Sequence, residues 1–190
     1  MNYLDLTNNV IRRMREDQVT SLYQNQQSTV VADLVNDAKR VVEDAHDWSC
    51  LATDMIVPTV AGTTTYPLTG SQNRATIIDV RDVTNGAMLH YVASAWVRRQ
   101  ELTNNVGQTR PSRWTESGID SNGDTLVKFW GTPDGVYRIS FHVILRTGDL
   151  TAEGSTTALP HMPIIHLAHA MAAQERGDVD GNDAGMLFQV

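Results

Sequence analysis

The spacing of apolar residues changes twice along this chain, and this change limits the possible folds more than any other feature of the sequence. Near the N-terminus apolar residues recur every three or four positions, first over Tyr3–Met14 and again over Val31–Ala45. Residues 54–146 instead show β-type patterns, and helical spacing returns over residues 163–176. Because side chains repeat about every 3.6 residues in a helix and every two in a strand, the chain is predicted to run helix, helix, sheet, helix.

The ends of the predicted helices carry their own signals. Ser28 or Thr29 is a suitable N-cap for the second helix, which should end near Asp47. Pro163 suits the first turn of the last helix, and Gly177 suits its end. These signals predict three helices of ordinary length.

The middle block contains several hairpin signals. Asn85-Gly86 lies between the β-like stretches TIIDVRDVT and AMLHYV, and DSNGD separates a strand near residues 112–116 from TLVKFWG. The stretch VYRISFHVILR alternates most clearly; Tyr137, Ile139, Phe141, Val143 and Leu145 share one face. About six antiparallel strands of this kind predict a small sandwich or barrel.

The order of these elements predicts an α+β fold. Residues 1–50 form an N-terminal helical segment, and residues 51–150 form an inserted antiparallel β-sandwich or barrel-like domain with a short helix near residues 94–105. Residues 151–190 provide a loop, a C-terminal helix and a tail that pack with residues 1–50. The two ends of the chain therefore make one helical layer.

Composition excludes several classes of protein. The 22 acidic and 15 basic residues give a formal net charge of −7, which disfavours strong nonspecific binding to nucleic acid. Cys50 is the single cysteine, so no intrachain disulfide is expected, and it is interpreted as a small buried residue. The sequence shows neither a signal-peptide layout nor a membrane-spanning run, and we expect a soluble, unsecreted protein.

Three histidines near the C-terminus raise the question of a metal site. His166 and His169 are three residues apart on the predicted last helix, but neither a glutamate between them nor a third ligand at helical spacing accompanies them. His161 precedes Pro163 and has a different local geometry. We therefore interpret them as boundary or interface residues, expect no cofactor or metal, and keep a metal-dependent enzyme using His166 and His169 as an alternative.

Other candidate motifs also favour structural interpretations. Asp120, Asn122 and Asp124 have the spacing that begins a calcium loop, but the glycine and acid that should follow are missing, which favours a hairpin turn. The sequence contains no Gly-Lys pair, so the standard phosphate-binding loop is excluded. Trp114 and Trp130 could stack on sugars if they were exposed, so a carbohydrate-binding, tail-associated β module remains a second alternative.

Several stretches, taken in order, resemble one known family. They are MNYLDLTNNVIRRMRED, DAHDW, IVPTVAGTTTYPL, TRPSRWTESG, KFWGTPDGVYRISFHVILR and LPHMPIIHLAHAMAAQERG. Together they span almost the whole chain, and they are similar to the head-to-tail adaptor proteins of tailed bacteriophages. This resemblance implies a virion structural protein rather than an enzyme. It implies a ring, commonly of twelve copies, that assembles beneath the portal after DNA packaging and then receives the tail.

The resemblance also implies partners and a location. The partners are the portal protein, a tail or nozzle protein and other copies of the chain; packaged DNA passes through without sequence-specific binding, and no membrane is involved. The location is the head-tail junction of a virion that is assembled in the host cytoplasm. An acidic channel would repel phosphate and let DNA slide. We expect the isolated protein to be monomeric or weakly associated and to form a ring only on the portal.

Two sets of residues are candidate interfaces. The portal or subunit interface is expected at Arg12, Arg13, Met186, Leu187, Phe188 and Val190, because arginines and apolar residues at a chain end suit protein contacts. Loops at one end of the β domain, with Asn105, Arg110, Asp120 and Asn122, are expected to face the tail. The apolar residues near the C-terminus form the tip of an arm that docks on a partner, or they fold back on their own subunit.

Overall fold

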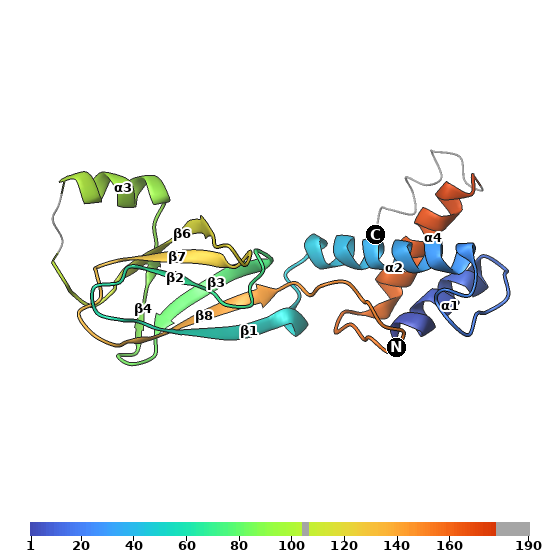
Figure 1. The fold of residues 1–190 in the computed structure, drawn as a ribbon, viewed down its shortest axis with the longest axis horizontal. Helices are drawn as coiled ribbons and strands as arrows, with labels where there is room; N and C mark the ends of the chain where they lie inside the picture. The colour runs from blue at the N-terminus through green and yellow to red at the C-terminus, as the bar shows by residue number, and fades with distance from the viewer. Residues whose placement is uncertain (104–106, 178–190) are drawn as a thin grey trace. The chain divides into compact units, whose positions relative to one another are not determined.

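The computed structural model describes residues 1–103 and 107–177, which form two compact units (Figure 1). One unit joins Met1–Cys50 to the residues from Thr147 onward, and we call it the helical unit. The other unit, Leu51–Arg146, contains both β-sheets, and we call it the β unit. The predicted α+β class, with helices at both ends and a sheet domain in the middle, is confirmed.

Three helices pack together in the helical unit: α1 (Tyr3–Arg13), α2 (Gln26–Ala45) and α4 (His161–Glu175). Their apolar faces form its core, which includes Leu6, Val10, Val35, Ala38, Ile164 and Ala168, each 0% exposed. Burial of this apolar surface is the main driving force for the packing of the three helices. None of the helices in the described ranges is long and apolar enough to cross a membrane.

The N-terminus of α2 corrects one prediction. Asn25 is the N-cap, and its side chain accepts a hydrogen bond from Ser28 N at 2.7 Å, while Ser28 Oγ accepts one from Asn25 N at 3.2 Å. Ser28 is thus the third helical residue of a capping box and not the cap. The apolar repeat that marked this helix starts at Val31, one turn after the true beginning, which is why the predicted start was too late.

The last helix follows its sequence signals more closely. Pro163 lies in the first turn of α4, where a missing backbone N–H breaks no hydrogen bond of the helix. Gly177 follows the C-cap Arg176 with a φ of 72°, a conformation that side-chain-bearing residues seldom adopt. The predicted end of this helix is therefore confirmed.

The β unit consists of two four-stranded sheets and not of a closed barrel. The first sheet has the order β1 (Ala52–Pro58), β8 (Arg138–Leu145), β3 (Ala75–Asp82), β4 (Ala87–Met88). The second has the order β2 (Thr65–Pro67), β7 (Thr125–Trp130), β6 (Arg113–Ile119), β5 (His90–Tyr91). All pairs are antiparallel except β5 with β6. The unit also contains α3 (Ser94–Thr103), and the short 3₁₀ helix η1 (Ser49–Leu51) spans its boundary.

Alternating side chains from the strands form the β core. Ile139, Phe141 and Val143 of β8 are 0% exposed, as the sequence pattern predicted, and Phe129 and Leu68 pack in the same cluster. The Asn85-Gly86 hairpin is confirmed by the pairing of β3 with β4. Cys50 is exposed, contrary to prediction, because the neighbouring Leu51 takes the buried position at this turn.

Candidate protein interaction surfaces

Arg12 and Arg13 lie in the last turn of α1. Arg12 is exposed and donates a hydrogen bond to Asn9 Oδ1 of the preceding turn at 2.7 Å. Arg13 is half-buried, and its guanidinium lies 3.1 Å from Nδ1 of His166 on α4. The end of α1 therefore presents positive charge, at the end of a helix where the backbone dipole favours cations.

The histidines of α4 are part of this basic region. Burial, together with the charge of Arg13 and the neighbouring His166, lowers the pKa of His169 below its ordinary value. Over the described ranges, no three His, Cys, Asp or Glu side chains are placed to hold a metal ion together. A guanidinium beside His166 also disfavours a second cation at that position, so the arrangement suits an anionic protein partner better than a metal.

An apolar groove of about 560 Å³ also opens on the helical unit. Its apolar lining includes Met14, Val30, Leu34 and Ala172, contributed by the end of α1, the first half of α2 and the last turns of α4. On its polar rim, a nitrogen of Arg176 lies 3.3 Å from a carboxylate oxygen of Glu16. Half-buried apolar side chains inside a polar rim are typical of a protein-binding groove. This groove could not be predicted from the sequence, because its walls come from three separate helices.

The turn of the β6–β7 hairpin, at one end of the β unit, is held by hydrogen bonds within the turn and to residues 70–72. Asp120 Oδ1 accepts hydrogen bonds from Asn122 N at 2.8 Å and from Asp124 N at 2.9 Å. Asp124 Oδ1 accepts two more, from Gly70 N and Gln72 N, both at 3.0 Å. The predicted hairpin turn is confirmed, because these carboxylate oxygens bind backbone N–H groups as in an Asx turn.

The opposite end of the β unit carries four connected loops, residues 59–64, 83–86, 107–112 and 131–137, which we call the distal loop cluster. Backbone and hydroxyl groups join them: Gly62 N donates to Pro133 O at 2.8 Å, and Thr109 N donates to Thr132 O at 2.7 Å. Thr84 Oγ1 accepts from Arg138 N, at the start of β8, at 2.8 Å. The cluster is thus a supported surface rather than a set of independent loops.

Exposed apolar residues gather in the distal loop cluster. Val60, Val83 and Val136 are 59%, 49% and 70% exposed. The β1–β8 pairing ends with Pro58 opposite Arg138 and continues with Thr59 N donating to Tyr137 O at 2.9 Å, so Val60 and Val136 come next on adjacent segments. Neighbouring exposed valines on a rigid loop surface indicate an interaction site.

The predicted tail-facing loops do not lie at one end of the β unit, so the prediction that they share one end was wrong. Arg110 belongs to the distal loop cluster and is exposed, whereas Asp120 and Asn122 follow the other end of β6. The seven residues of β6 lie between them. Arg146, the last residue of the β unit, lies at the same end as this hairpin. Residues 71–74 connect the two, because Arg146 N donates a hydrogen bond to Arg74 O and Thr125 N donates one to Ser71 Oγ. Asn105 lies outside the described residues.

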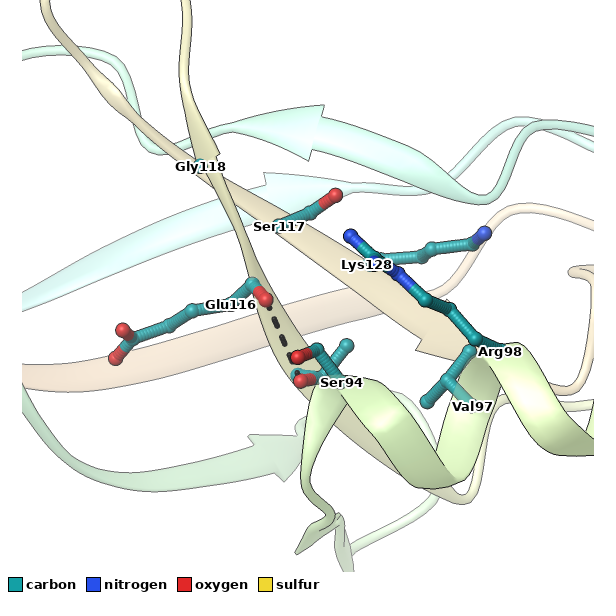
Figure 2. Close-up of a pocket in the computed structure, with 8 residues that line it drawn as sticks. Ser94, Val97, Arg98, Glu116, Ser117, Gly118 and Lys128 are labelled. Carbon is teal, nitrogen blue, oxygen red and sulfur yellow. Dashed lines mark hydrogen bonds between the residues drawn. The ribbon is translucent and has the colours of Figure 1, made fainter.

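Helix α3 covers part of the second sheet and frames a polar pocket of about 320 Å³. Figure 2 shows Arg98 of α3 and Ser117 of β6 at this pocket, with the side chain of Glu116 directed away from it. Lys128 forms an ion pair with Glu101. Beside the pocket, Trp96 and Trp130 make an edge contact with ring centroids 5.4 Å apart, and the Arg113 guanidinium lies 4.6 Å from the Trp96 ring.

The carbohydrate-binding alternative assumed that Trp114 and Trp130 were exposed, and the structure corrects this assumption. Trp114 is 4% exposed and contacts Phe141 in the β core, so it cannot stack on a sugar. Trp130 is half-buried against Trp96. In a strand, successive side chains point to opposite faces, and Trp114 lies on the inner face of β6 opposite Phe129. Sequence composition alone did not show which face was buried.

Comparison with known proteins gives one family. No curated protein matches the chain. The family model of the SU10 adaptor protein matches residues 1–189, and thus includes the helical unit and the β unit alike. The chain therefore belongs to the SU10 adaptor protein family, a family of bacteriophage head-to-tail adaptors.

Proposed function

We propose that this chain is a virion structural protein that forms a ring, of twelve copies by resemblance, beneath the portal. In this position the ring completes the head after DNA packaging and provides the surface to which the tail or nozzle protein attaches. The observation that carries the proposal is the family match over residues 1–189, because it includes both units and not one module alone. A chain with two separate cores can present one surface to each of two partners.

The basic end of α1 is our candidate for the portal or subunit contact. Arg12 is exposed and Arg13 is backed by His166, so both can face acidic groups of another protein. Arginine suits such a contact, because its planar guanidinium binds a carboxylate with two parallel hydrogen bonds. Met186, Leu187, Phe188 and Val190 lie outside the described residues, and their part in this contact stays a prediction.

The distal loop cluster is our candidate for the tail-facing surface. It combines the exposed valines with Arg110, and protein interfaces commonly join an apolar centre to polar groups at the rim. Its loops are bonded to one another, so little conformational entropy is lost when a partner binds. Asp120 and Asn122, at the other end of β6, are not part of this surface.

The net charge is compatible with the passage of DNA. With a formal charge of −7 in each copy, a ring of this protein repels the phosphate backbone instead of holding it. DNA then moves through without the many lysine and arginine contacts that tight backbone binding requires. Membership of a family of structural adaptors also favours a role without catalysis.

Binding to portal-containing heads tests this proposal. Purified protein is mixed with packaged heads that lack the adaptor, and the particles are imaged by negative-stain electron microscopy. We expect added ring density beneath the portal, and tail attachment only to heads that carry it. Arg12→Glu should weaken head binding by about tenfold or more, as expected when an interfacial charge is reversed.

Arg99→Glu is the matched control, because Arg99 is also an exposed arginine on a helix, in the middle of α3. It should bind heads as the unmodified protein does. Absence of density from heads incubated with unmodified protein would refute the adaptor role. Equal binding of both variants would instead refute only the assignment of the contact to α1.

A further inference from the structure

The apolar groove of the helical unit lies at the point where the described chain ends. Ala172 lines the groove on α4, and Arg176, the C-cap of that helix, forms part of its rim. At about 560 Å³ the groove falls within the roughly 300–1,000 Å³ of typical binding pockets. Val30 and Leu34 of α2 are half-buried there, so part of their apolar surface remains uncovered by the described residues.

The sequence after Gly177 contains an apolar segment that could occupy this groove. Residues 178–185 contain three aspartates and two glycines, and Met186, Leu187, Phe188 and Val190 follow them. Large apolar side chains are unfavourable in water, and an uncovered apolar groove in the same unit is a place where they can be buried. The groove and this segment are thus complementary in their apolar character.

We infer that Met186–Val190 bind in the groove of their own subunit. This inference goes beyond the proposed function and does not depend on it. Nine positions separate Gly177 from Met186, which corresponds to at most roughly 30 Å of extended chain, and the groove rim includes the residue just before Gly177. A connection this short gives the segment an effective concentration on the order of millimolar at its own groove.

The short connection between Gly177 and Met186 also favours the subunit's own groove over the groove of another copy. A segment from a second molecule must compete with one that is present at about millimolar effective concentration, and it cannot do so in dilute solution. The free subunit therefore keeps both apolar surfaces covered. Release of the segment exposes the groove and the segment together, so a partner that binds either one shifts the subunit towards an assembly-competent state.

Disulfide trapping tests the inference on the full-length chain. Cys50 is replaced by serine, and one cysteine is placed in the groove and one in the segment by Leu34→Cys and Phe188→Cys. Under mild oxidation at low protein concentration, we expect an intramolecular disulfide, seen as a faster-migrating monomer band without reductant and as a linked peptide pair by mass spectrometry.

The matched control pairs Phe188→Cys with Asp33→Cys, because Asp33 is the exposed neighbour of Leu34 on α2 and does not line the groove. This control should form the bond at least about tenfold more slowly. Equal rates, no disulfide, or disulfides only between molecules would overturn the inference. Circular dichroism checks that each variant is folded, and Val30→Cys replaces Leu34→Cys if the latter is not.

Deletion of residues 184–190 gives a second measurement. Because the segment covers apolar surface of its own subunit, the truncated protein should melt several degrees lower than the full chain. A deletion that leaves the melting temperature unchanged would contradict binding within the subunit and would favour an arm that docks on a partner.

Discussion

Removing the carboxylate of Glu43 should destabilise the helical unit strongly. Lys39 Nζ lies 2.8 Å from Glu43 Oε1, and the two side chains are 1% and 0% exposed. Lys39 also donates to Thr147 O at 3.3 Å and to Gly148 O at 3.0 Å, and Thr147 Oγ1 donates to Glu43 Oε1 at 2.6 Å. This network fixes the segment by which the chain returns to the helical unit from the β unit.

The structure sets the expected magnitude. Glu43→Ala leaves the Lys39 ammonium buried without its counter-charge, and breaking a buried ion pair in this way typically costs about 3–5 kcal/mol of unfolding free energy. The exposed pair of Arg40 and Asp37 on the same helix provides the control, at 45% and 54% exposure. Asp37→Ala should cost no more than about 1 kcal/mol, because water screens that pair.

Urea titrations followed by far-ultraviolet circular dichroism measure both effects. The double variant Lys39→Met, Glu43→Leu should recover part of the lost stability, since apolar residues of similar size need no counter-charge in a buried site. The recovery is incomplete because Thr147 and Gly148 lose the hydrogen bonds that Lys39 and Glu43 made with them. The reasoning is refuted if Glu43→Ala costs as little as Asp37→Ala. It is also refuted if the double variant is as unstable as Glu43→Ala.

Because the pKa of His169 is lowered in the folded state, the folded protein binds fewer protons than the unfolded chain. The contribution of His169 to stability is therefore full above about pH 6.5 and falls as the pH drops below that value. Urea midpoints measured at pH 7.5 and 5.5 should show this fall, and the fall should be smaller in His169→Gln. The isolated protein should have the mass of a monomer by mass photometry, and a stable closed ring without portal would contradict that expectation. Val136→Asp should leave the circular dichroism spectrum and head binding unchanged but reduce tail attachment, since Val136 is 70% exposed on the distal loop cluster; normal attachment would exclude that surface. 

Features that depend on neighbours in the sequence were predictable. The Asn85-Gly86 turn, the alternation of β8 and the glycine end of α4 all follow from backbone preferences within a few residues. The start of α2 was missed, because its first turn is polar and the apolar repeat begins later, at Val31. Local signals therefore predicted which elements exist better than where each one begins.

Features that depend on strand order were not predictable. Trp114 and Trp130 are both tryptophans in β-like sequence, yet one lies in the core and the other on the outer face of the second sheet. Arg110 and Asp120 are ten positions apart in the sequence, which suggested one loop surface, but β6 places them at opposite ends. The apolar groove of the helical unit was not predictable for a similar reason, because residues of three separate helices line it.

The division into two cores makes the proposed roles separable by mutation. Glu43 bonds Lys39 and Thr147 of the helical unit, and Val136 is exposed on the β unit, so we expect each variant to act first on its own unit. If both partners bound the helical unit, Glu43→Ala would impair head binding and tail attachment together. If each unit serves one partner, Glu43→Ala should impair head binding alone when tail protein is offered to the free subunit, and Val136→Asp should show the reverse. Measuring both variants against both partners therefore tests the assignment of surfaces without requiring a ring.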